Sequence, residues 1–73
     1  MKHYLAIFVE GFYESLESFA TVEQRAAYAE GIVRGGGLYG GNVDTYDLPE
    51  QLDSMKRTAA AGHAIAAYEA RDA

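Results

Sequence analysis

Four carboxylates gather in a stretch of the chain that has no basic residue. No lysine or arginine lies between Arg34 and Lys56, and that stretch carries four acidic side chains: Asp44, Asp47, Glu50 and Asp53. One interpretation is a solvated loop and helix start, since runs of charge usually face water. The other is an acidic patch that steers and orients a basic partner protein. The sequence leaves both interpretations open.

The glycine-rich stretch before these carboxylates has the residue spacing of a nucleotide-binding motif but not its structural context. Gly35, Gly37 and Gly40 have the G-x-G-x-x-G spacing. That motif binds a pyrophosphate where a strand leads into a helix, because free backbone amides point at the phosphates there. Here the glycines follow a predicted helix and lead into a predicted strand. We therefore expect a flexible connection and no cofactor.

The residue types that most often carry catalysis or hold metals are scattered. His3 and His63 are the only histidines, and neither has a metal-binding partner adjacent in the sequence. The chain has no cysteine, which excludes thiolate zinc sites and cysteine nucleophiles. The serines, among them Ser15, Ser18 and Ser54, lack the nucleophile-elbow context. We expect neither a metal site nor an enzyme.

Aromatic residues offer a second candidate binding surface. One side of a predicted hairpin carries an aromatic patch that would be exposed if no helix covers it: Tyr4, Phe8 and Tyr13. The alternative is that the second helix covers this side. Tyr39 and Tyr46 flank the acidic stretch and are further candidate anchors, because tyrosine buries a large area at interfaces and keeps a polar group. An aromatic platform for nucleic acid would need more nearby basic residues than Lys2.

The hairpin that would position these rings is predicted over residues 3–19. His3–Val9 is rich in apolar and aromatic residues, Glu10-Gly11 is a two-residue turn, and Phe12–Phe19 is the returning strand. Counting across the turn pairs Val9 with Phe12 and Leu5 with Leu16. Both pairs then lie on an aliphatic side, which should meet a helix.

Two helices and a third strand follow. Thr21–Gln24 matches a capping box, and a helical stripe of Val22, Ala26, Ala29 and Val33 follows it, with Arg25 away from the stripe. Asn42–Leu48 is predicted as the third strand. The last helix is predicted over Leu48–Glu69, with this core-facing stripe: Leu48, Leu52, Met55, Ala59, Gly62 and Ala66. The small residues Ala59, Gly62 and Ala66 would also allow two copies to pair closely as a homodimer.

Size and composition limit the number of domains and the classes of partner. The chain has 73 residues and a net charge of −5, which favours one domain over residues 1–73 and disfavours direct binding to nucleic acid or anionic membranes. No apolar run reaches the length of a membrane span or a signal peptide. The lack of cysteine favours a reducing compartment, so we expect a cytoplasmic protein. The element order predicts an α+β fold, ββαβα, with a three-stranded mainly antiparallel sheet in order 2-1-3.

In size, acidity and element order the chain resembles small accessory proteins of bacteriophages, including anti-CRISPR proteins. The segment Ser18–Tyr28, a hairpin that runs into a capped helix, and the glycine-rich run Gly35–Asn42 carry the resemblance. It implies a stoichiometric inhibitor of a host defence complex, at work in the host cell cytoplasm, and no residue role is transferred from it. We therefore expect an acidic inhibitor or regulator of a larger basic complex. The alternative is a self-associating structural or regulatory module.

Overall fold

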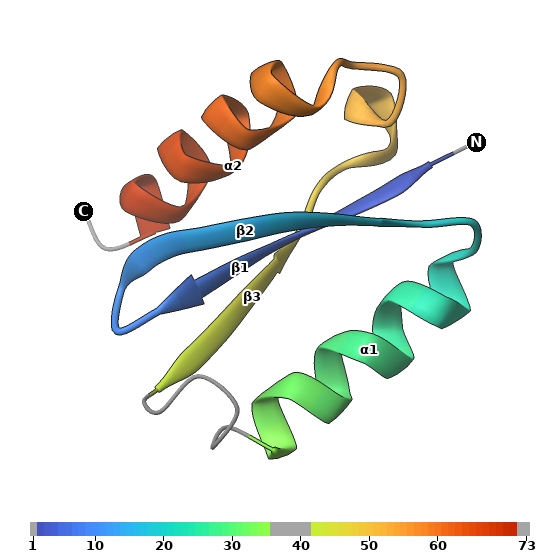
Figure 1. Ribbon diagram of the computed structural model, residues 1–73. Coiled ribbons are helices and arrows are strands. Elements are labelled where there is room, and N and C mark those ends of the chain that lie inside the picture. The colour runs from blue at the N-terminus through green and yellow to red at the C-terminus, as the bar shows by residue number, and fades with distance from the viewer. Residues whose placement is uncertain (1, 36–41, 72–73) are drawn as a thin grey trace.

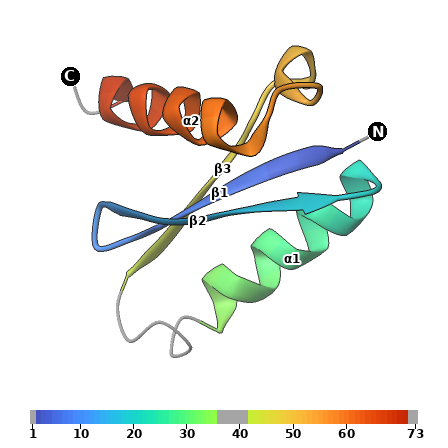
Figure 2. The ribbon, with the colours of Figure 1, turned by 45° about the horizontal axis from the view of Figure 1, so that its top comes forward.

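The computed structural model describes residues 2–35 and 42–71, which form a three-stranded sheet between two helices. The elements along the chain are β1 (His3–Val9), β2 (Phe12–Phe19), α1 (Val22–Arg34), β3 (Val43–Asp47), a 3₁₀ helix (Glu50–Leu52) and α2 (Arg57–Arg71). β1 is central and pairs antiparallel with both β2 and β3. The two helices cover opposite faces of the sheet (Figure 1, Figure 2). The predicted ββαβα fold with strand order 2-1-3 is confirmed.

The β1–β2 hairpin turns on two residues, as predicted. Glu10 and Gly11 have φ angles of +53° and +83°, and positive φ at both positions is typical of the type I′ turn, whose twist matches that of the strands. Glycine adopts this conformation freely, whereas Glu10 is held from the side. Its amide donates to the carbonyl of Asn42 at 2.8 Å, and its Oε1 accepts from the Asn42 amide at 3.1 Å. The start of β3 therefore fixes the turn.

A β-bulge in β2 shifts the predicted register by one residue. The two pairs next to the turn are as predicted, but Glu14 then has no partner on β1. Beyond the bulge Leu16 lies opposite Ala6, and not opposite Leu5 as predicted. A slip of one residue exchanges the two faces of a strand. Leu16 is therefore buried under α2, whereas Leu5 packs on the α1 side.

The aromatic side of the hairpin is covered by α2. Tyr4 and Phe8 are buried, so the predicted exposed patch is wrong and the alternative of a covering helix is confirmed. The ring of Phe8 stacks on Tyr68 with centroids 3.8 Å apart, and the Tyr4 hydroxyl donates to the carbonyl of Met55 at 2.8 Å. Small buried residues on α2 allow this close approach: Ala60 and Ala64.

Helix α1 begins at the predicted cap but turns a different side to the sheet. The Thr21 hydroxyl accepts a hydrogen bond from the amide three residues on, as a capping residue does. Ala29 packs against the core as predicted, beside buried Ile32. Val22 and Val33, also predicted to face the core, are exposed, and Arg25, predicted to lie away from it, is buried. Arg25 faces inward because its guanidinium donates to two backbone carbonyls at the end of the sheet.

The single helix predicted over Leu48–Glu69 is wrong, because a turn divides it. The 3₁₀ helix ends at Leu52 and α2 begins only at Arg57. This turn resets the helical phase, so the small residues predicted to face the core face outward: Ala59, Gly62 and Ala66. The 15 residues of α2 measure about 22 Å, close to the roughly 23 Å of a seven-residue strand. The division therefore fits the helix to the sheet. Within residues 2–35 and 42–71 no helix has the length and apolar character needed to cross a membrane.

Candidate interaction surfaces

The two aspartates of β3 lie on opposite faces of the sheet. Side chains alternate along a strand, so Asp44 and Asp47, three residues apart, point to different sides. Asp44 Oδ2 lies 3.8 Å from Arg71 Nη1 of α2, and Asp47 Oδ1 lies 3.6 Å from Arg25 Nε of α1. The sheet therefore separates these two carboxylates, and each of them already faces an arginine.

The other two acidic residues of the stretch differ in burial. Glu50 is exposed on the 3₁₀ helix, whereas Asp53 is only 4% exposed. Asp53 Oδ2 lies 3.0 Å from Nδ1 of His3, which is also buried. The two groups lie close together but are not aligned for a hydrogen bond. Asp53 cannot meet a partner surface directly, and its place in the predicted patch is corrected.

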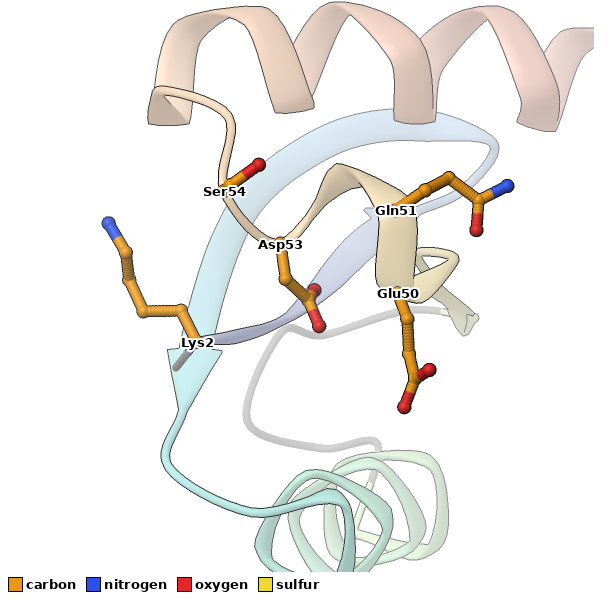
Figure 3. Close-up of a pocket in the computed structure, with 5 residues that line it drawn as sticks. All are labelled: Lys2, Glu50, Gln51, Asp53 and Ser54. Atoms are coloured by element: carbon orange, nitrogen blue, oxygen red, sulfur yellow. The ribbon is translucent and has the colours of Figure 1, made fainter.

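A pocket of about 530 Å³ opens beside this buried pair. Its lining comes from the first residue of the described chain and from the segment around the 3₁₀ helix: Lys2, Glu50, Gln51, Asp53 and Ser54. In Figure 3 the Lys2 side chain extends away from the Asp53 carboxylate, and the Ser54 hydroxyl points away from it as well. Both oxygens of Asp53 are shielded from solvent. The pocket therefore lacks a serine positioned against a base, which nucleophilic catalysis requires.

The tyrosines predicted as anchors differ in how far they are exposed. Tyr46 is half-buried and packs against the core under α2. Tyr39 lies outside the described residues. Tyr13 is 37% exposed, and its ring meets the ring of Phe8 edge-on, with centroids 6.0 Å apart. Of the aromatic patch predicted on the hairpin, only Tyr13 therefore keeps an accessible ring.

The end of the hairpin presents an exposed surface that sequence reasoning missed. We call residues Glu10–Glu14 the hairpin tip. Phe12, predicted to meet a helix, is 77% exposed, because α1 covers the sheet without reaching this end of it. The hairpin tip lies on the side of the molecule where α2 ends (Figure 1). Glu14, the extra residue of the bulge and the last residue of the hairpin tip, is also exposed.

A second stretch without basic residues could have indicated this surface. From His3 to Gln24 the chain has no lysine or arginine, but it has four glutamates: Glu10, Glu14, Glu17 and Glu23. None of the four forms an ion pair with any residue in the described ranges. The unbalanced negative charge thus lies on the hairpin and the start of α1, and less on β3, where the aspartates face arginines.

The structure was also searched for metal-binding groups, and the chain was compared with known proteins. Within the described parts of the chain, no group of three or more histidine, aspartate and glutamate side chains is placed to hold a metal ion. No model of a known protein family, no curated protein and no solved structure matches this chain.

Proposed function

We propose that this protein is an acidic binding protein that inhibits or regulates a larger protein or complex with a basic surface. A nucleic-acid-handling complex, such as a CRISPR-type host defence complex, is the target class that the bacteriophage resemblance favours. The observation that carries the proposal is the unbalanced charge of the hairpin. Glu10, Glu14 and Glu17 have no ion-pair partner among the described residues, although the chain carries six basic side chains.

Unpaired surface carboxylates suit recognition better than they suit stability. Glu14 and Glu17 stand on an edge strand, where charge also discourages uncontrolled pairing with other strands. Unbalanced negative charge raises the rate of encounter with a basic partner and helps to orient it, and salt screens this effect. A basic surface that normally takes nucleic acid is complementary to such carboxylates.

Affinity capture followed by a salt series tests the proposal. The tagged protein is used to isolate its partner from the native host, and the affinity of the purified pair is then measured at increasing salt. We expect a partner at stoichiometric ratio whose affinity falls several-fold between about 0.05 M and about 0.3 M salt. Recovery of the protein alone, or an affinity that does not depend on salt, would contradict the proposal.

Neutral variants then locate the charge. We expect Glu14→Gln combined with Glu17→Gln to weaken binding and to reduce its dependence on salt. Glu30→Gln is the matched control, because Glu30 already pairs with Arg34 on α1. Asp44→Asn tests the acidic stretch of β3 in the same way. Asn is preferable to Lys at this position, because reversal of the Asp44 charge would place a second cation beside Arg71.

Self-association through α2 is the second candidate function, and one observation favours it. The small residues Ala59, Gly62 and Ala66 face outward, and a Cβ atom added at Gly62 would meet nothing within 4 Å. Two copies could therefore bring these helices close together. Light scattering at micromolar concentration distinguishes the two candidates. A dimer that becomes monomeric on Gly62→Leu would support self-association, and a strict monomer would exclude it.

A further inference from the structure

Phe12 is the most exposed of the large apolar side chains in the described chain, at 77%. A single exposed apolar residue is common on protein surfaces and needs no explanation by itself. What sets Phe12 apart is its setting. It directly follows the turn, lies opposite Val9 on the central strand, and has exposed or half-exposed neighbours on the same hairpin tip: Tyr13 and Glu14.

The hairpin tip is held rigidly on both sides of Phe12. On one side, the backbone and the carboxylate of Glu10 are bonded to Asn42. On the other side, the ring of Tyr13 rests edge-on against Phe8, which stacks on Tyr68 of α2. The backbone that carries Phe12 is therefore fixed before any partner arrives. A preorganised segment loses little conformational entropy on binding, so more of the contact energy appears as affinity.

The charged residues near Phe12 in the sequence indicate what kind of partner surface it would bind. The side chains of Glu10 and Glu14 flank it in sequence, and neither forms an ion pair with another described residue. A surface that receives Phe12 must therefore be apolar at its centre and basic at its rim, because binding cores are depleted of charge while rims are polar. A second copy of this chain would bring glutamates against glutamates, and phosphates would be repelled in the same way.

We infer that the hairpin tip docks into an apolar pocket rimmed by lysine or arginine on a partner protein, with Phe12 as the anchor. The inference rests on the proposed function and specifies the contact surface. Aromatic anchors surrounded by weaker polar contacts carry most of the energy of many interfaces. Glu10 and Glu14, which flank Phe12 in the sequence, would provide the polar contacts.

Displayed peptides provide a test that does not require the natural partner. Short random peptides displayed on phage are selected against the intact protein, and bound peptides are mapped by amide chemical shifts in NMR spectra. We expect enriched peptides to combine lysine or arginine with apolar residues, and their shifts to concentrate on residues 10–14. Phe12→Ala should weaken these peptides roughly 30-fold.

The control is Val33→Ala, which removes another exposed apolar side chain, on α1. We expect it to leave peptide affinity unchanged. Glu14→Lys gives a second, independent variant, which should weaken basic peptides while the NMR spectrum shows an intact fold. Basic peptides that bind elsewhere and ignore Phe12→Ala would overturn the inference and leave the proposed function standing. The absence of any basic peptide among the selected binders would overturn both.

Discussion

Arg25 joins three parts of the molecule through one guanidinium group. Nη1 donates to the carbonyls of Tyr4 and Leu48, both at 3.3 Å, while Nε lies 3.6 Å from Asp47. The site is buried, so loss of the guanidinium would leave the Leu48 carbonyl without a donor and the Tyr4 carbonyl with the Leu48 amide alone. A buried hydrogen bond lost in this way costs about 1–3 kcal/mol. We expect Arg25→Met to lower the free energy of unfolding in urea by roughly 2–4 kcal/mol.

Arg34→Met is the matched control for this prediction. Arg34 pairs with Glu30 one turn away on the exposed side of α1, and such surface pairs contribute only about 0.3–0.5 kcal/mol. Equal losses of stability in the two variants would contradict the role given to Arg25. The contacts of Arg25 also explain why the predicted core-facing side of α1 was partly wrong. Helical spacing from Val22 predicts Arg25 away from the core, and the carbonyls that hold it inward are not visible in the sequence.

The buried side chains of His3 and Asp53 should be energetically coupled. Their side chains are largely removed from water, with Nδ1 and Oδ2 3.0 Å apart. Removal of one partner leaves the polar group of the other buried without its partner, whereas removal of both does not. In a double-mutant cycle, His3→Ala and Asp53→Ala should therefore be coupled by roughly 1–3 kcal/mol, with the double variant less destabilised than the sum. Strictly additive losses would show that the contact contributes nothing.

Alanine substitutions at two glycines, one in the hairpin turn and one inside α2, should change stability in opposite directions. Gly11 has a φ of +83° in the hairpin turn, where an L side chain is strained. Gly62 lies inside α2 and has open space where a Cβ would go. We expect Gly11→Ala to destabilise by about 1 kcal/mol and Gly62→Ala to stabilise by about 0.5–1 kcal/mol in thermal or urea unfolding. A destabilising Gly62→Ala would instead indicate a close contact at this helix face, as a homodimer would make.

The elements that sequence reasoning located correctly are those with local signals. The turn at Gly11 and the cap at Thr21 depend on a few neighbouring residues, and both were predicted. The bulge at Glu14 and the turn after Leu52 depend on tertiary packing, because the sheet must receive Leu16 under α2 and α2 must fit its length. Local periodicity carries no information on either, which is why the register and the last helix were wrong.

The same distinction applies to the candidate site across the whole molecule. The acidic stretch of β3 is visible in the sequence, but Arg25 and Arg71, which face its aspartates, are distant in the chain. The exposed ring of Phe12 could not be predicted, because exposure depends on where α1 ends in space. The stretch without basic residues over residues 3–24 is the one sequence signal that points to the hairpin. Charge balance after pairing, and not charge along the chain, therefore locates the candidate surface.

Unbalanced charge also has a consequence for the free protein. With a net charge of −5, repulsion among the unpaired glutamates opposes the folded state, and salt screens this repulsion. We expect added sodium chloride to raise the Tm in calorimetry. Glu14→Gln with Glu17→Gln should raise the Tm in low salt by about 2–4 °C, equivalent to roughly 0.5 kcal/mol, and should reduce the effect of salt. Glu30→Gln, which breaks an ion pair with Arg34, should not raise it. A Tm that falls steadily with salt would mean that ion pairs outweigh the repulsion, and the hairpin would then hold no surplus charge to offer a partner.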